Sequence, residues 1–221
     1  MMLMKTIAAR EDLTEITRLL RMTAPWVASQ ARSGQSVRIK VWPDSPLLSL
    51  PLVECDTTAG LITIVIQKET EVAKDLWELD VGDGVFKIEG PVGHPLEMEQ
   101  YGTVVCVAID WGIAVLRGLV RALAQAGNRI VSFVQVDTKA HLFWQEHFCY
   151  ASAYSSVTTL DDSLGRGGHV GHQLAMWLLS GRLADLVVIV GPAAAVEPLQ
   201  RLAESQGVRV VVISDGLEAP F

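Results

Sequence analysis

The segment from Val104 to Val131 contains the residue types that could bind a nucleotide. It reads VVCVAIDWGIAVLRGLVRALAQAGNRIV: an apolar run, a short turn, an amphipathic stretch and a second apolar run. Glycine-rich turns of this kind let a dinucleotide approach the backbone, and the helix dipole attracts its phosphates. The turn here has one glycine, Gly112, and one carboxylate, Asp110. We interpret Asp110 as a helix N-cap, because its spacing does not suit the alternative, a hydrogen bond to ribose.

Residue types that bind metals or react as thiols are sparse. His169 and His172 stand three residues apart, but a zinc site needs further ligands, so a surface or packing role is favoured. The three cysteines, Cys55, Cys106 and Cys149, form no CxxC pair. We interpret them as buried thiols in a reducing cytoplasm rather than as disulfides or metal ligands.

Composition excludes several classes of protein. The chain has 221 residues, enough for one large or two small domains, and it is 50% hydrophobic. Its formal net charge of -7 argues against nucleic acid, which needs a basic footprint. No apolar run reaches the roughly 18 residues of a membrane helix, and the first residues lack a signal peptide's apolar stretch. We therefore expect a cytoplasmic protein without a membrane span.

The secondary structure that would position these residues changes near Tyr101, from mostly strands before it to alternating strands and helices after it. Before it, alternation at 36–42 and apolar runs at 61–66 and 85–88 predict strands, and 70–79 could be a helix. Short strands separated by Gly and Pro turns indicate a small barrel or sandwich.

After Tyr101, strands and helices alternate. The predicted strands are 104–108, 130–136, 154–159, 186–190 and 208–213, and the predicted helices are 113–126, 141–148, 169–180 and 196–206. Gly127 suits a helix C-cap. Continuous apolar runs are typical of parallel strands buried on both faces, so this half is predicted to be a doubly wound α/β domain. The expected domains are 1–98 and 99–221.

Several segments resemble the ferredoxin–NADP reductase superfamily, and one branch of it in particular. They are APWVASQARSGQSVRI at 24–39, LWELDVGDGVFKIEGPVGHP at 76–95, YGTVVCV at 101–107, LVRALAQAGNRIV at 119–131, VTTLDDSLGRGGHVGHQL at 157–174 and VVIVGPAAAV at 187–196. The branch contains the electron-transfer subunit of dihydroorotate dehydrogenase and the small subunit of NADH-dependent ferredoxin:NADP oxidoreductase. The resemblance implies an N-terminal FAD-binding-type β-barrel followed by a doubly wound α/β nucleotide-binding-type domain.

The FAD motifs of this branch are altered here. In relatives an R-x-P-L-[ST] strand holds the pyrophosphate with its arginine, a task that suits a bidentate cation. The matching segment keeps Pro51 and Leu52 but has Ser49 at the arginine position and Val53 at the hydroxyl position. A second element, G-x-[ST]-[ST] at a helix start, corresponds to TEVA at 70–73, which lacks glycine and includes Glu71. Packing without FAD and retention of FAD through backbone contacts are the two interpretations.

The nucleotide turn of the branch, GGG-x-G-[IV]-A-P, has also changed. Its first three glycines align with Ala108, Ile109 and Asp110, and its proline aligns with Val115. Gly112 matches. Ile109 and Trp111 would crowd a dinucleotide, and Asp110 would repel its phosphates.

Two further loops keep part of their pattern. Gly165 and Gly168 persist in the loop at 157–174. Arg166 in this loop could meet a 2′-phosphate, or it could be a solvated cation. Gly191 persists in the GP loop, but Val190 replaces the cysteine found in many relatives. By family position, the candidate cofactor-binding residues are Pro51, Leu52, Val53, Asp110, Gly112, Gly165, Gly168 and Gly191.

The branch normally ends with a cysteine-rich segment that holds an iron–sulfur cluster. Ligation needs about four thiolates or substitutes, and no cysteine follows Cys149. We therefore expect no cluster. Two functions fit: a structural or adaptor subunit beside a larger flavin or iron–sulfur redox subunit, or an active FAD-dependent NAD(P)H oxidoreductase subunit. FAD binding stays open, and NAD(P)H binding is disfavoured.

Overall fold

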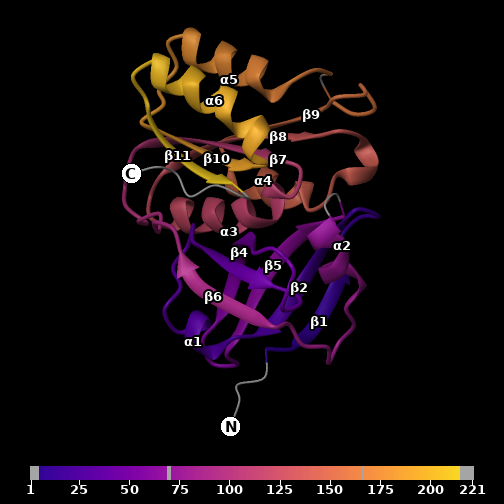
Figure 1. The fold of residues 1–221 in the computed structure, drawn as a ribbon. Helices are drawn as coiled ribbons and strands as arrows, with labels where there is room; N and C mark the ends of the chain where they lie inside the picture. The colour runs from indigo at the N-terminus through magenta and orange to yellow at the C-terminus, as the bar shows by residue number, and fades with distance from the viewer. Residues whose placement is uncertain (1–4, 69–70, 166, 215–221) are drawn as a thin grey trace. The chain divides into compact units, whose positions relative to one another are not determined.

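A computed structural model describes residues 5–68, 71–165 and 167–214 of the chain. The chain divides into two compact units, with the division between Leu96 and Glu97. Each unit has its own sheet and its own hydrophobic core (Figure 1). None of the helices in the described part is long and apolar enough to span a bilayer.

The first unit is a six-stranded antiparallel sheet closed into a barrel. Its elements are β1 (Ile7–Asp12), β2 (Thr17–Thr23), α1 (Pro25–Ala28), β3 (Ser36–Lys40), β4 (Leu48–Asp56), β5 (Leu61–Gln67), α2 (Glu71–Glu78) and β6 (Lys87–Val92). The strand order is β1-β2-β5-β4-β3-β6. Residues just before the two end strands join the edges: Thr6 pairs with Gly84, and the Val85 N–H donates to the Lys5 carbonyl at 3.0 Å.

The barrel core follows from alternation along the strands. Val37, Ile39 and Val41 point inward and are fully buried, so the intervening Arg38 and Lys40 lie on the outer face. The prediction of a strand at 85–88 was wrong in its bounds, because β6 begins at Lys87 and continues through Pro91 to Val92. β6 pairs with β3 alone among the named strands, and a proline is tolerated on such an edge strand because no ladder donor is lost.

The second unit is a five-stranded parallel sheet with helices on both faces. Its elements are β7 (Thr103–Ile109), α3 (Gly112–Gln125), β8 (Arg129–Val136), a 3-10 turn (Lys139–His141), α4 (Gln145–Ala151), β9 (Tyr154–Thr159), α5 (Val170–Leu179), β10 (Leu186–Gly191), α6 (Ala193–Ser205) and β11 (Arg209–Ser214). The strand order is β11-β10-β7-β8-β9. α5 and α6 cover one face, and α3 and α4 cover the other (Figure 1).

The burial of the strands in this unit explains why apolar runs in the sequence predicted them. Every residue of β7 and β10 is buried, as expected for central parallel strands between two helix layers. Gly127 follows α3 with a φ of 88°, the left-handed conformation that ends many helices. The single helix predicted at 141–148 is instead a 3-10 turn and α4, separated by residues 142–144, the last of which, Trp144, has a φ of 54°.

Candidate functional site

The strand order places the candidate nucleotide site between β7 and β10. These two strands are neighbours, but the helices that follow them, α3 and α6, lie on opposite faces of the sheet (Figure 1). In doubly wound sheets, ligands bind outside the carboxyl ends of the strands at such a switch point. The carboxyl ends here are Ile109 and Gly191.

An isoleucine side chain occupies this switch point. A Cβ built on Gly191 would lie 2.8 Å from the Ile109 Cβ, so the two residues are in direct contact. Ile109 is only 2% exposed, and it belongs to the core that includes Val170 of α5 and Val196 of α6. Ile109 aligns with the second glycine of the family's nucleotide turn, so the residue at this position is part of the apolar core.

Asp110 keeps the backbone conformation of a glycine and lies one residue before the N-cap position of α3. Its φ is 50°, a left-handed value that aspartate tolerates better than most residues. Its N–H donates to the Gln135 carbonyl at 2.9 Å. The predicted N-cap role was wrong, because the N-cap position of α3 is Trp111, which makes no side-chain cap hydrogen bond. Asp110 instead supplies a carboxylate in the turn before α3.

Gly112 and Trp111 are both closely packed. A Cβ on Gly112 would lie 2.1 Å from the Val190 carbonyl oxygen, so a glycine is needed for α3 to approach β10. Trp111 is 5% exposed. The retained glycine thus has a packing reason, and the indole is buried rather than projecting into solvent.

Gln135 links the turn to α5, and our sequence reasoning missed it. Its side chain is 6% exposed, and its Oε1 accepts the Val170 N–H at 2.7 Å, while its carbonyl accepts the Asp110 N–H. One signal was available: an amide near the end of a mostly apolar strand. A buried amide there must have partners, since an unpaired buried polar group is costly.

The loop between β9 and α5 is held by its own hydrogen bonds. Gly165 has a φ of 73° and pairs with Thr158, and a Cβ there would lie 2.3 Å from the Val157 carbonyl oxygen. Gly168 has a φ of 103° with open space around it. Arg166, the candidate for a 2′-phosphate, lies outside the described residues.

Asp161 is the charged centre of this loop. Its Oδ1 accepts the Ser163 N–H at 3.0 Å and the Ser163 hydroxyl at 2.6 Å. These hydrogen bonds lower the pKa of Asp161 below its usual range. The Ser163 Oγ also accepts the Lys139 N–H at 2.8 Å, which ties the loop to the segment after β8.

The barrel positions of the FAD motif lie on β4. Pro51 and Leu52 are buried and Val53 is half-buried, next to an irregularity in the pairing with β5 between Leu52 and Glu54. Ser49, at the arginine position, pairs directly with Arg38 of β3. For the motif expected at 70–73, Thr70 lies outside the described residues, as does the side chain of Glu71.

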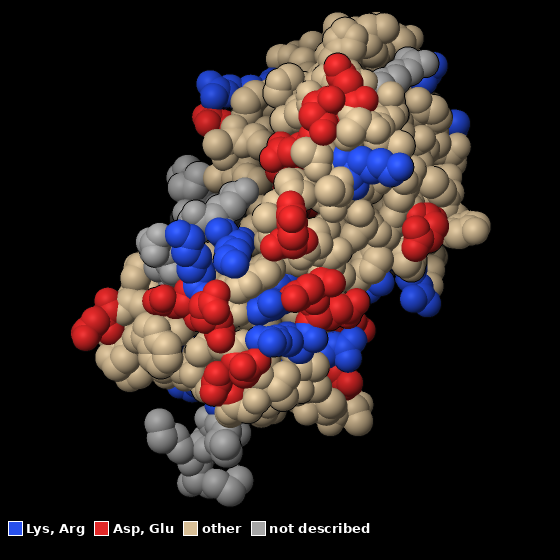
Figure 2. All heavy atoms as spheres, turned by 90° about the vertical axis from the view of Figure 1, so that its right-hand side faces the viewer, with Lys and Arg blue, Asp and Glu red and all other residues tan. Residues whose placement is uncertain are grey.

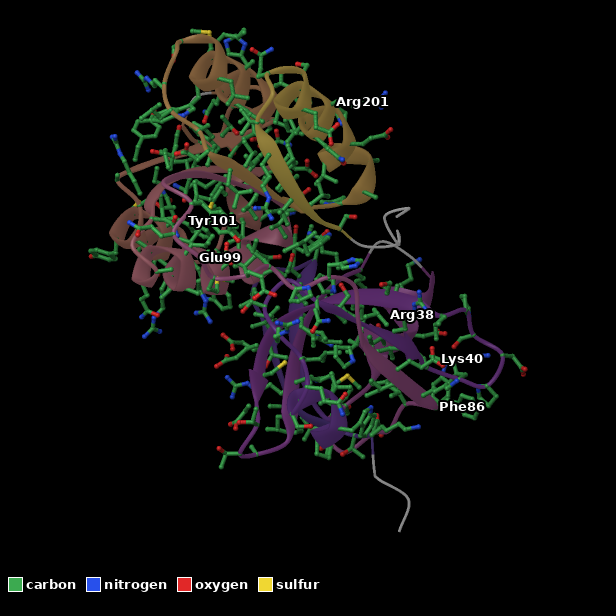
Figure 3. The ribbon with its side chains drawn as sticks, turned by 90° about the vertical axis from the view of Figure 1, so that its left-hand side faces the viewer. Arg38, Lys40, Phe86, Glu99, Tyr101 and Arg201 are labelled. Carbon is green, nitrogen blue, oxygen red and sulfur yellow. The ribbon has the colours of Figure 1, made fainter. Side chains whose placement is uncertain are left out.

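Arg38 is part of a charged row on the outer face of the barrel. Arg38, Lys40 and Phe86 follow one another along one side of this unit, and the Lys40 Nζ lies 6.0 Å from the Phe86 ring centre (Figure 3). Glu89 of β6 pairs in register with Arg38 and forms an ion pair with Lys87. Lys87, with a smaller contribution from Arg38, lowers the pKa of Glu89.

Elsewhere on the barrel, charges of both signs are interspersed. Figure 2 shows Lys and Arg side chains next to Asp and Glu side chains on the face that it presents. Arg10 pairs with Asp80 at 2.6 Å, and Arg18 forms a bidentate pair with Asp12. These residues form pairs of opposite charge, with Arg18 buried in its pair, rather than a patch of a single sign.

The cysteines differ in their surroundings. Cys106 is fully buried, and desolvation raises its pKa to about 12. Cys55 is half-buried, and burial raises its pKa as well. Cys149 is exposed, so the prediction of three buried thiols was wrong for this residue, which lies on the outer side of α4. Within the described ranges, no three His, Cys, Asp or Glu side chains gather as metal ligands would.

Sequence comparisons find relatives with a redox role. The chain is 30% identical over 189 residues to a dihydroorotate dehydrogenase B (NAD(+)) electron transfer subunit homolog of Thermotoga maritima, covering 86% of this chain and 66% of the relative. It is 32% identical over 171 residues to the electron transfer subunit of Bacillus caldolyticus, covering 75% and 66%. The chain thus spans slightly less than two thirds of these relatives. No protein-family model matches it.

Comparison with solved structures also finds oxidoreductases. A chain of the NADH-dependent reduced ferredoxin–NADP oxidoreductase superposes with a TM-score of 0.83 at 27% identity, covering 95% of this chain and 75% of that chain. An Amycolatopsis cytochrome P450 reductase superposes with a TM-score of 0.78 at 20% identity, covering 96% and 68%. The second likeness concerns the fold alone.

Proposed function

We propose that this chain is a subunit of a multi-subunit electron-transfer oxidoreductase of the ferredoxin–NADP reductase superfamily, and that its role is structural or that of an adaptor. Its α/β domain would pack against other parts of the complex without binding NAD(P)H. The electron-transfer subunits among its relatives support the assignment to a complex. We take residues 1–98 and 99–221 as the functional domains and the cytoplasm as the location.

The observation that carries this proposal is the Ile109 side chain at the switch point. A pyrophosphate must approach the backbone at the carboxyl end of β7, where glycines leave room for it. Ile109 fills that position with core side-chain atoms, and Trp111 is buried two residues later. Asp110 adds a negative charge at the N-terminal end of α3, which opposes binding of a phosphate.

The redox centres of such a complex would lie mainly in a larger partner subunit. The 221 residues contain three cysteines, fewer than the four thiolates of a usual iron–sulfur site, and those three are far apart in sequence. We therefore propose that this chain supplies no cluster and that the partner holds the flavin or iron–sulfur centre.

Calorimetric titration of the purified chain with NADH and with NADPH tests the proposal. We expect no binding in the low micromolar range for either nucleotide. The matched variant is Ile109→Gly, which restores one glycine of the nucleotide turn. It should bind NADH and NADPH no more weakly than the natural chain does. A dissociation constant in the low micromolar range for the natural chain would refute the loss of the site.

The second candidate function is an active FAD-dependent electron-transfer subunit. The favouring observation is on β4, where Pro51 and Leu52 are retained and Arg38 lies across from the serine that replaces the motif's arginine. Bound FAD would accept hydride and release single electrons to a partner. A visible absorption spectrum of the purified chain separates the two candidates, since only the second predicts a yellow flavoprotein.

A further inference from the structure

Large apolar side chains are exposed at the C-terminal end of α5 and in the turn that follows it. Met176 is 59% exposed, Leu179 66% and Leu183 72%, which places them among the most exposed large hydrophobic residues of the described chain. α5 lies on the outer side of the second unit, with α6 packed beside it (Figure 1). A contiguous exposed apolar patch, unlike single exposed residues, is typical of an interaction site.

The buried Trp177 side chain joins these residues into one patch. Its Nε1 donates to the Leu183 carbonyl at 3.2 Å, and the Arg182 guanidinium lies over its ring, 4.6 Å from the ring centre. The exposed Tyr154 of β9 adds a second ring, with its centre 5.9 Å from that of Trp177. We call this patch the α5 face, and its residues are Tyr154, Met176, Trp177, Leu179, Arg182 and Leu183.

The residue types of the α5 face are those of protein interfaces. Interface cores are enriched in Tyr, Trp, Met and Arg and are depleted in Lys, Glu and Asp. The α5 face has one residue of each enriched type and two leucines, and the sequence has no Asp or Glu between Asp162 and Asp185. Its single charge, Arg182, is already stacked on Trp177. Covering this face therefore desolvates none of the carboxylates that would make burial costly.

We infer that the α5 face binds the α5 face of a second copy of this chain, in a contact related by a two-fold axis. The inference goes beyond the proposed function and does not depend on it, because two copies can pair whether or not a redox partner is bound.

Net charge favours this face for a contact between copies. Each chain has 18 basic and 25 acidic residues, a net charge of -7, so two copies repel each other. A contact through residues without carboxylates keeps that repulsion out of the interface. In a two-fold contact the same patch lies on both sides and must be complementary to itself. Apolar side chains meet this condition, whereas a patch of one charge sign does not.

The small size of the α5 face sets the expected affinity. Its residues are fewer than the roughly 20–30 on each side of a standard interface. We therefore expect monomer and dimer to be in equilibrium, with a dissociation constant in the micromolar range.

Sedimentation velocity of the purified full chain, over about 1–200 μM, tests the inference. The natural chain should shift with concentration from the 24.0 kDa monomer towards twice that mass. Met176→Glu places a carboxylate in the contact on both copies and should weaken the dimer by about tenfold or more. The matched control is Tyr150→Glu, which removes an exposed large side chain from α4, on the opposite face of the same sheet (Figure 1). It should leave dimerisation unchanged.

Opposite charges on the two copies make the test specific. Met176→Lys should also weaken the dimer, but an equimolar mixture of Met176→Lys with Met176→Glu should associate more tightly at low salt than either variant does by itself. Met, Glu and Lys have similar helix propensities, so α5 should persist in both variants. Thermal unfolding verifies that each variant is folded.

A natural chain that stays monomeric over the whole concentration range would overturn the inference and leave the α5 face to a different partner. Equal dimerisation of Met176→Glu and Tyr150→Glu would also overturn it, as would a mixture that associates no better than its components. None of these results bears on the titrations with NADH and NADPH, so this inference and the proposed function fail separately.

Discussion

Ile109 and Gly191 touch at the carboxyl ends of the two central strands of the α/β domain. A Cβ on Gly191 would lie 2.8 Å from the Ile109 Cβ and 3.0 Å from the Ile109 carbonyl oxygen. The residue in the GP loop must therefore be a glycine because of its neighbour in the core. This contact gives Gly191 a packing role that needs no dinucleotide.

Gly191→Ala should lower the free energy of unfolding by about 1–3 kcal/mol, since the added methyl group overpacks a filled core. Urea denaturation measures the change. In an Ile109→Gly background the same substitution should cost less, because the Ile109 Cβ, the nearest obstructing atom, has gone. Strict additivity of the two substitutions would contradict the contact.

Gly112→Ala should be at least as destabilising, because its Cβ would collide with the Val190 carbonyl, which is backbone and cannot turn aside. Gly171→Ala is the matched control, since its Cβ would meet only the end of the Leu199 side chain, at 3.0 Å. The control lies in α5, where alanine is favoured over glycine by about 1 kcal/mol. Equal losses of stability in the two variants, measured by thermal unfolding, would argue against close packing of α3 on β10.

Trp111→Gly should reduce stability by about 3–5 kcal/mol, as for other losses of a large buried side chain. The indole is 5% exposed, so the stability effect is expected in the isolated chain, before any partner is added. Chemical denaturation and co-purification with the partner subunit together check this. A stable variant that no longer co-purifies would instead assign Trp111 to the interface.

Asp12→Asn should destabilise the barrel in a pH-dependent way. Asp12 accepts hydrogen bonds from the buried Arg18 side chain, whose Nη1 also donates to the Trp77 carbonyl. Arg18 lowers the pKa of Asp12 below its ordinary value of 3.8, so the pair stabilises the fold above that pH and loses its effect as pH falls through the lowered pKa.

The carboxylate of Asp12 is largely exposed, which limits the expected difference at pH 7 to about 1 kcal/mol. Urea denaturation at pH 7 and at about pH 3 is the measurement, and the difference in stability between the natural chain and the variant should be smaller in acid. A difference that grew in acid would mean that the ionised carboxylate is not the stabilising form. Glu11→Asn, at the adjacent exposed position of β1, is the control.

The isolated chain should contain no stoichiometric iron or acid-labile sulfide. The physical reason is that the chain has too few thiolate ligands. It has three cysteines, and Cys106 is fully buried with a raised pKa, which disfavours the thiolate that would bind iron. Metal analysis after anaerobic purification is the measurement. Near-stoichiometric iron with sulfide would show that substitutes for thiolates complete a cluster.

Local pattern in the sequence was enough for the elements that are regular and buried. The alternation of Val37, Ile39 and Val41 identified β3, and the unbroken apolar runs identified β7 and β10. These signals are local, because each is the order of apolar and polar residues within one strand. Alternation indicates one buried face, and an unbroken apolar run indicates two. The strands β1 and β2 gave no such signal, since β2 buries Arg18, and a buried arginine is possible only with the partners that the fold brings to it.

The sequence by itself determined the fold class and the loss of the motif residues, because both depend on residue types in order along the chain. Only the tertiary structure decided that Ile109 fills the switch point, that Trp111 rather than Asp110 holds the N-cap position, and that Arg38 lies opposite Ser49. Each of these depends on strand order and register, which bring together residues that are far apart in sequence. A shift of one residue in register would move Arg38 to the other face of the sheet, and no local pattern reports such a shift.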